Sequence, residues 1–282
     1  MAVKLILDST VDVRADIKDQ FMFVPLTVTF GDEEYIDGVT IDHQKFYEKL
    51  VESDVLPTTS QASPAAFEDL FCKLTQNGDE AVVLTLSSAL SGTYQSACIA
   101  AADYPGKVYV VDTKSATIGS GILAEYGLQL VKAGMGAEAV ARELTQMRQQ
   151  VCVVAMLDTL EYLKKGGRIS AAAALAGGLL SIKPVISLSE GKIVILGKAR
   201  GSKQGNNLLV QQIEKAGGVD FDKPLLLGYT GLSDLLLQKY VQDSEHLWQE
   251  AAEGLQYAPV GSVIGTHAGP GAIAVAFFKK QQ

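Results

Sequence analysis

Hydroxyl side chains are dense in the stretch PTTSQAS at residues 57–63, where four of the seven residues are serine or threonine. A serine or threonine nucleophile needs a general base within hydrogen-bond reach. The stretch contains no acid, base or cysteine that could activate one of its hydroxyls. Neutral hydroxyls can donate hydrogen bonds to the oxygen atoms of a ligand. The stretch is therefore better suited to holding a ligand than to breaking one of its bonds.

The elements that must position these hydroxyls follow an alternating pattern. Short apolar runs rich in β-branched residues predict buried parallel strands, at residues 3–7, 81–86, 107–111 and 151–157. Helical patterns lie between and after these runs, at residues 64–76, 93–102, 118–132 and 137–149. Alternation of strand and helix is typical of an α/β fold with a mostly parallel sheet. Residues 21–38 are expected to form an edge strand or an extended segment, because Pro25 disfavours a central strand.

After residue 157 the pattern changes. The glycine-bearing turn KKGGRIS precedes a predicted small-residue helix, AAAALAGGLLS. Residues 182–200 predict two antiparallel strands joined by a Ser-Glu-Gly turn. We expect the rest of the chain to contain strands at 224–230, 261–265 and 272–278, with a helix at 233–253. The sequence thus predicts an α/β protein of two domains, residues 1–160 and a mixed domain 161–282, with a cleft between them.

More hydroxyls and two aspartates follow the predicted strands of the first domain. These polar residues form three groups: Asp8, Ser9 and Thr10; Ser87, Ser88, Ser91 and Thr93; and Asp112, Thr113, Ser115 and Thr117. Ligands of open α/β sheets bind outside the carboxyl ends of the strands. Ser63 and Pro64 are a favourable start for a helix, and helix N-termini favour anions. The groups predict either a binding rim for an anion or ordinary helix caps and loops.

Composition excludes several classes of protein. The net charge of −8, without a basic block, disfavours nucleic acid and anionic membrane surfaces as partners. No apolar run approaches the ~18 residues of a membrane-spanning helix, and the first ten residues do not form a signal peptide. The three cysteines form no CxxC pair, which favours a reduced cytoplasm and buried thiols.

Motifs for cofactors, metals and nucleophilic catalysis are weak. The chain contains no phosphate-binding loop GxxxxGK[ST] and no nucleophile elbow GxSxG. The stretch GSGILA at 119–124 begins too far after its strand for a dinucleotide turn. His43 and His246 are expected on the solvated surface, and the three histidines show no metal-ligand spacing. We therefore expect no cofactor and no metal.

His267 stands apart from the other histidines. It lies in VIGTHAGPGAIAVAF, which predicts a strand, a glycine-rich turn and a second strand. In such a turn it could donate a hydrogen bond to an anion or cap the turn. It is also the one histidine that could serve as base for a serine, with Asp8 or Asp112 behind it. A small-molecule hydrolase or transferase using a Ser–His site is therefore an alternative to a binding protein.

Seven ordered segments resemble the successive signatures of the DegV family. They are LDST at 7–10, PTTSQ at 57–61, SGTYQSA at 91–97, VDTKSATIGSG at 111–121, LEYLKKGGRIS at 160–170, IKPVI at 182–186 and GTHAGPG at 265–271. The resemblance covers essentially the whole chain. It implies a Rossmann-like N-terminal sheet, a mixed C-terminal α/β domain, and one long-chain fatty acid bound between them.

The resemblance also implies a partner and a set of contact residues. Such proteins are the binding subunit of the bacterial fatty acid kinase system, and present the acyl carboxylate to a separate kinase that makes acyl phosphate for phospholipid synthesis. By residue match the carboxylate contacts are Thr59, Ser91 and His267, with Ser60 and Gly92 as neighbours. Arg168 and Arg200 match basic positions in the head-group region or on the kinase-facing surface. The resemblance implies no catalysis by this chain itself.

Elementary energetics make such a site intelligible. About 16 methylenes at ~0.8 kcal/mol each give roughly 13 kcal/mol of gross transfer free energy. Association costs about 4–15 kcal/mol in lost freedom. The tail must therefore supply most of the affinity and requires apolar walls. An ionised carboxylate is costly to bury unless it is hydrogen-bonded, and hydroxyls with an imidazole can supply those bonds.

Overall fold

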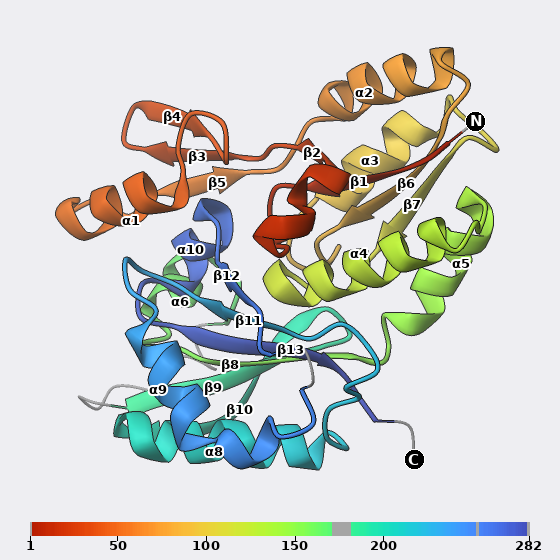
Figure 1. Ribbon diagram of the computed structural model, residues 1–282. Helices are drawn as coiled ribbons and strands as arrows, with labels where there is room; N and C mark the ends of the chain where they lie inside the picture. Colours follow the sequence, from red (N-terminus) through yellow and green to blue (C-terminus); the bar gives the residue numbers. More distant parts are fainter. Residues whose placement is uncertain (1, 171–181, 252–253, 281–282) are drawn as a thin grey trace.

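The computed structural model describes residues 2–170, 182–251 and 254–280 (Figure 1). Its first sheet has the strand order β2-β1-β6-β7. The strands are β1 (Val3–Asp8), β2 (Met22–Val24), β6 (Glu80–Thr85) and β7 (Val108–Asp112). Each neighbouring pair is parallel, which confirms the prediction for β1, β6 and β7. This sheet is the Rossmann-like part of the fold.

Helices cover both faces of the first sheet, and alternate residues of β1 pack against opposite helical layers. Leu5 and Leu7 pack with α4 (Thr117–Lys132) and α5 (Ala137–Met147), whereas Ile6 packs with α2 (Pro64–Gln76) and α3 (Thr93–Ala101). Successive side chains of a strand point to opposite faces, so an apolar run with no polar alternation needs cover on both sides. Figure 1 shows these two helical layers above and below the sheet. The four helices predicted within residues 64–149 are confirmed to within two residues at each end.

The second sheet has six strands in the order β10-β9-β8-β13-β11-β12. They are β8 (Val151–Met156), β9 (Ile182–Ser189), β10 (Lys192–Arg200), β11 (Leu226–Tyr229), β12 (Tyr257–Pro259) and β13 (Ile273–Phe278). Among the described strand pairs of this sheet, only β11–β12 is parallel. One face packs on α4, and the other is covered by α8 (Gly201–Lys215) and α9 (Leu235–Asp243). The α/β fold with a parallel sheet and a second, mixed sheet is confirmed.

The prediction of a parallel strand at 151–157 is wrong in its direction and its sheet. β8 pairs antiparallel with β13 and β9 in the second sheet. An apolar run indicates burial on both faces, but it carries no information on the partner strand. The domain division near residue 160 stays a prediction, and the pairing of β8 favours a boundary before Val151.

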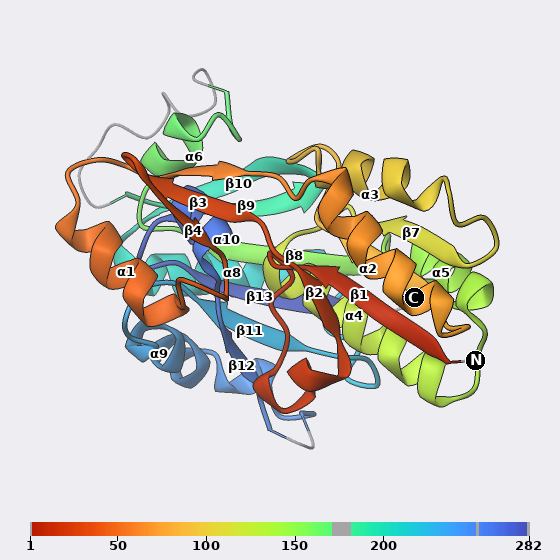
Figure 2. The same ribbon diagram turned by 90° about the horizontal axis from the view of Figure 1, so that it is seen from above.

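A three-stranded ribbon projects from the first sheet and lies over the second domain (Figures 1 and 2). It consists of β3 (Thr27–Phe30), β4 (Glu33–Ile36) and β5 (Thr58–Ser60), with α1 (His43–Glu52) between β4 and β5. β3 pairs antiparallel with both other strands. Residues 21–38 thus form the edge strand β2 and then the extended ribbon, with Pro25 between them. The ribbon and α1 contact α10 (Ser262–Ala268).

Two further predictions for the C-terminal half are wrong. Residues 261–265 were expected to be a strand, but Ser262–Ala268 form the helix α10. The helix expected at 233–253 ends at Asp243, and a short 3₁₀ turn follows. Short apolar runs such as GSVIG show neither helical nor strand periodicity, so tertiary contacts decide their structure. The small-residue helix expected after residue 170 lies outside the described residues.

Candidate functional site

A cavity of about 430 Å³ lies between the two sheets. This volume falls within the range of small-molecule pockets. Its walls are mostly apolar and come from both domains; they include Leu86, Val153, Ala155, Ile186, Val263 and Ala274. Polar side chains from β5, the start of α3 and the end of α10 also line it. The cavity thus combines a large apolar interior with a set of polar groups.

Thr59 and His267 meet at the wall of this cavity. Thr59 lies on β5, His267 lies near the end of α10, and Oγ1 of Thr59 is 3.0 Å from Nε2 of His267. The other ring nitrogen, Nδ1, is buried and has no hydrogen-bond partner among the described residues. The ring packs directly over Gly166, where a Cβ atom would lie 2.1 Å from Nδ1. Gly166 therefore leaves the space that the imidazole fills.

The environment of His267 keeps its ring neutral. Burial, and secondarily the positive charge of Arg168, lower the pKa of His267 to about 4. Desolvation disfavours the charged imidazolium, and a nearby cation adds repulsion. At neutral pH the ring therefore carries one proton and offers one donor and one acceptor.

Ser91, Gly92 and Ser60 line the same cavity. Oγ of Ser91 accepts a hydrogen bond from the N–H of Thr93 at 3.2 Å and shares one with the Thr93 hydroxyl at 2.9 Å. Gly92 precedes α3, and a Cβ atom there would lie 2.1 Å from Oε1 of Gln61. The end of the ribbon and the start of α3 are thus in contact. The structure brings together Thr59, Ser60, Ser91, Gly92 and His267.

The two arginines singled out by the sequence differ in position. Arg168 lines the cavity, and its guanidinium donates to the carbonyl oxygens of Leu90 at 3.3 Å and Gly166 at 2.6 Å. Arg200 is exposed where β10 leads into α8, and it is not part of the cavity wall. Of the two arginines, only Arg168 lies at the cavity wall, and the head-group or kinase-facing roles of both stay predictions.

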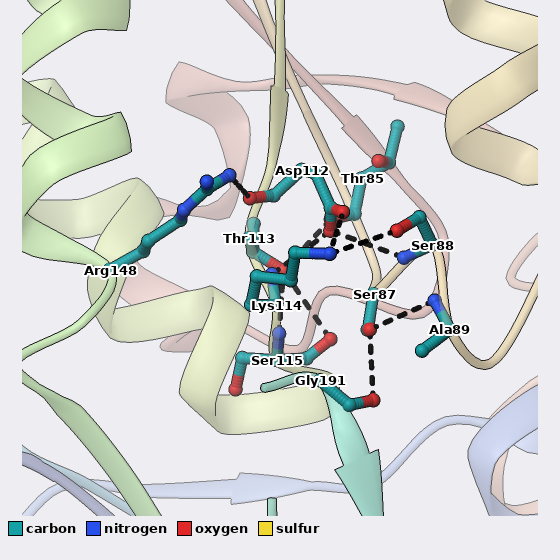
Figure 3. Close-up of polar contacts among 10 residues, drawn as sticks. All are labelled: Thr85, Ser87, Ser88, Ala89, Asp112, Thr113, Lys114, Ser115, Arg148 and Gly191. Atoms are coloured by element: carbon teal, nitrogen blue, oxygen red, sulfur yellow. Dashed lines mark hydrogen bonds and ion pairs between the residues drawn. The ribbon is translucent and has the colours of Figure 1, made fainter. Parts of the chain in front are cut away.

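Most of the remaining hydroxyls after β6 and β7 bind the protein's own chain (Figure 3). Thr113 donates to the carbonyl of Thr85 at 2.8 Å, and Ser87 donates to the carbonyl of Gly191 at 2.9 Å. Asp112 accepts hydrogen bonds from the backbone of Ser88 at 3.1 Å and Lys114 at 3.0 Å. For these residues the interpretation as caps and loop contacts is correct. Ser91 and Thr117 are the members of the three groups that line the cavity.

A Ser–His–Asp arrangement is not assembled. The described contact of His267 is with Thr59. Asp8 is fully buried and accepts from Leu86 N at 2.7 Å and from the Thr10 backbone and hydroxyl at 2.9 and 2.5 Å. Asp112 forms an ion pair with Lys114 at 3.0 Å. Neither proposed third member therefore orients the imidazole.

The sequence did not indicate that His43 is partly buried and contacts backbone carbonyl groups. The ring is half-buried, with Nδ1 3.0 Å from the carbonyl oxygen of Val260 and Nε2 2.9 Å from that of Gly231. The expectation of a solvated surface residue is wrong, because α1 lies against the second domain rather than in solvent. His246 is exposed, as expected. No local signal distinguishes these two histidines, since both occur in charged stretches.

The described parts of the chain contain no group of three or more His, Cys, Asp or Glu side chains that could hold a metal ion. The three cysteines are free thiols, and they are partly exposed rather than buried as expected. Among the described helices, none combines the length and apolar character needed to span a membrane.

Comparisons with known proteins identify the family of this chain. The model of a family described as "Uncharacterised protein, DegV family" matches residues 2–280. A DegV domain-containing protein of Caldanaerobacter subterraneus is 31% identical, with 99% of each chain covered. A similar protein of Deinococcus radiodurans is 32% identical over 98% of each chain.

Solved structures show the same architecture. A fatty-acid-binding DegV family protein from Thermus thermophilus is 33% identical to this chain, with a TM-score of 0.88. The match covers 99% of this chain and 100% of that one. DegV of Bacillus subtilis, a fatty acid binding protein, is 27% identical with a TM-score of 0.82 over 99% and 100%. A protein from Eubacterium eligens loaded with heptadecanoic acid is 25% identical with a TM-score of 0.84 over 99% and 100%. With the family match spanning both domains, this chain belongs to the DegV family.

Proposed function

We propose that this protein binds one long-chain fatty acid in the cavity between its sheets. The observation that carries the proposal is the lining of that cavity, an apolar interior with Thr59, Ser91 and His267 at its wall. The tail would lie among the apolar side chains, where burial of each methylene contributes ~0.8 kcal/mol. The fatty acids bound by the structural relatives support this ligand class.

The carboxylate would be held by neutral donors rather than locked in a buried ion pair. Thr59, Ser60 and Ser91 contribute hydroxyls, and Gly92 contributes its backbone N–H at the start of α3. His267 supplies one N–H in its neutral form, and Arg168 adds a positive charge whose donors are partly occupied by carbonyl oxygens. Such a set satisfies a buried carboxylate and leaves its oxygens free to react.

We further propose that a separate ATP-dependent kinase uses the bound acid as substrate. A carboxylate oxygen would attack the γ-phosphorus of ATP, so that acyl phosphate forms and ADP leaves. Within this scheme the chain itself is a cytoplasmic carrier, without a nucleotide site of its own, that serves phospholipid synthesis. Arg200, exposed beside α8, is available for contact with the kinase.

The ligand is tested by extraction and titration. Purified protein is extracted with organic solvent, and released acids are identified by mass spectrometry. We expect about one long-chain acid per chain, and tight 1:1 calorimetric binding of hexadecanoic acid after delipidation. Empty extracts together with no heat of binding would show the proposal to be wrong. Stoichiometric labelling of Ser91 by a serine-directed phosphonate would instead support the hydrolase or transferase.

The head-group residues are tested by paired substitutions. Thr59→Val and Ser91→Ala each remove one donor to a charged group, so each should weaken binding by about tenfold, or ~1.4 kcal/mol. Thr58→Val is the matched control, because Thr58 precedes Thr59 on β5 but is exposed and outside the cavity wall. The same variants should slow acyl phosphate formation by the kinase. An unchanged rate in the Thr59→Val/Ser91→Ala double variant would contradict the head-group assignment.

A further inference from the structure

Three polar side chains from the first 43 residues hold the segment 260–262, immediately before and at the start of α10. The N–H of Gly261 donates to Oδ1 of Asp12 at 3.0 Å. The N–H and hydroxyl of Ser262 both donate to Oδ1 of Asp37, at 3.3 and 2.5 Å. Nδ1 of His43 lies 3.0 Å from the carbonyl oxygen of Val260. We call Asp12, Asp37 and His43 the clasp.

Forming the clasp requires the burial of ionisable groups. Asp37 is 6% exposed, and its Oδ2 is buried with no partner among the described residues. Burial raises the pKa of Asp12 to about 7, and it raises the pKa of Asp37 as well. His43 is half-buried, and its two ring nitrogens face the carbonyl oxygens of Val260 and Gly231. Burial of carboxyl groups is unfavourable unless hydrogen bonds compensate for the lost hydration, and here the N–H groups of Gly261 and Ser262 donate such bonds.

The segment held by the clasp leads directly into the helix that carries His267. α10 has seven residues, too few to be stable through its own hydrogen bonds. Its direction is therefore set by contacts at its start and along its sides. Val260, Val263, Ile264 and His267 all line the cavity, so a small rotation of α10 would move both the wall and the imidazole.

Asp12 also connects the start of α10 with the start of α4. Its Oδ2 accepts a hydrogen bond from the Thr117 hydroxyl at 2.5 Å. Thr117 begins α4 with a φ of 48°, which is unfavourable for a β-branched residue. Thr117 and Val260 both line the cavity. One carboxylate thus joins the starts of two helices from the two domains.

We infer that Asp12, Asp37 and His43 are positioning residues for the carboxylate site, holding α10 so that His267 meets Thr59. The inference rests on the proposed function, since it assigns the clasp to the head group of the same ligand. A positioning role differs from a general stabilising role in one consequence. If the clasp positions α10, removing a clasp residue must change the environment of the His267 ring in protein that is still folded.

The experiment measures His267 directly in ligand-free protein. The ring protons of His267 are followed by NMR through a pH titration in the wild type, Asp37→Ala, Asp37→Asn and His43→Ala. The wild type should titrate near pH 4. In the two alanine variants the ring becomes more exposed, so its midpoint should rise by one pH unit or more. Asp37→Asn keeps an acceptor for Ser262 and should titrate like the wild type.

Calorimetry with hexadecanoic acid provides the second readout. Asp37→Ala and His43→Ala should lose at least tenfold in affinity, and Asp37→Asn should stay within about threefold of the wild type. Asp8→Ala is the matched control, because Asp8 is fully buried but bonds Thr10 and Leu86 instead of α10. It should lower stability without moving the His267 midpoint. If Asp37→Ala does not fold, His43→Ala provides the test, because His43 is only half-buried and its substitution disturbs the fold less.

A His267 midpoint near 4 in the folded alanine variants would overturn the inference, whatever their stability. Failure of the wild type to bind fatty acid would refute the proposed function instead. The NMR titration needs no ligand, so it would still decide whether the clasp positions His267.

Discussion

Oγ1 of Thr59 lies 3.0 Å from Nε2 of His267, although 208 residues separate them in the chain. The threonine belongs to the ribbon that projects from the first sheet, and the histidine belongs to a helix of the second domain. Their contact closes one part of the cavity wall across the domain boundary. The contact of Thr59 with His267 therefore exists only when the two domains are packed together.

Gly166→Ala should displace the imidazole of His267. The new Cβ atom would lie 2.1 Å from Nδ1 and 2.7 Å from Cε1, and the rigid ring must move. We expect the Thr59 contact to break and fatty acid affinity to fall at least tenfold, measured by calorimetry. Gly136→Ala is the control, because a Cβ atom there meets nothing within 4 Å and should leave affinity unchanged. Equal affinities in both variants would contradict the close packing of His267 on Gly166.

Stability should depend on pH through His267. The pKa of the folded group is about 4, below the unfolded value of about 6.5, so the folded state binds fewer protons between these values. This contribution to the free energy of unfolding is complete above about pH 6.5. It falls by up to about 3 kcal/mol as the pH drops to about 4.

Three buried aspartates act in the opposite direction, since burial also raises the pKa of Asp37. The pKa of Asp8 is raised by burial to about 6 and that of Asp12 to about 7, so their contributions grow as the pH falls. The His267 contribution is therefore isolated by comparing wild type with His267→Gln in urea denaturation at pH 7.5 and 4.5. We expect the difference in the free energy of unfolding between the two proteins to change with pH. A pH-independent difference would count against a buried, neutral His267.

Arg168→Gln should affect the ligand and the imidazole together. Loss of the positive charge should weaken fatty acid binding several-fold, and the pKa of His267 should rise while staying below 6.5 because burial is the larger cause. Calorimetry and NMR titration measure these two effects. Arg200→Gln is the comparison, because Arg200 lies outside the cavity wall. It should retain full affinity, and it should slow acyl phosphate formation only if this surface faces the kinase.

The turn between β9 and β10 offers a stability test. Glu190 and Gly191 have φ values of 47° and 77°, the pattern of a hairpin turn that favours Asn-Gly. Glu190→Asn should relieve part of the left-handed strain and raise the melting temperature by about 2 °C. Gly191→Ala should lower it by several degrees, because the Cβ atom would also lie 2.1 Å from Oγ of Ser87.

This turn also connects the two domains. The carbonyl of Gly191 accepts a hydrogen bond from Ser87 at 2.9 Å, as Figure 3 shows, and the strands beside it carry Ile186 and Ile193 of the cavity wall. Gly191→Ala should therefore weaken fatty acid binding as well as folding, whereas Glu190→Asn should leave affinity unchanged. Scanning calorimetry with and without hexadecanoic acid separates the two effects.

Local signals sufficed for much of the first domain. The apolar runs predicted β1, β6 and β7 because strands buried on both faces need continuous apolar residues. Ser63 and Pro64 predicted the start of α2, and the structure shows Oγ of Ser63 accepting from the N–H of Ala66 at 3.2 Å. Family resemblance added Thr59, Ser91 and His267, which the structure brings to one cavity. Their contact with a carboxylate stays a proposal.

The sequence by itself determined which segments are buried, where several helices begin and which family the chain resembles, because these depend on side-chain type and near neighbours. Only the tertiary structure decided that β8 joins the second sheet, that residues 262–268 form a helix and that His43 faces two carbonyl groups of the other domain. The pairing of β8 with β13 and the contacts of His43 join residues more than 100 positions apart. Their free energies depend on how whole layers pack, which no short stretch of sequence encodes.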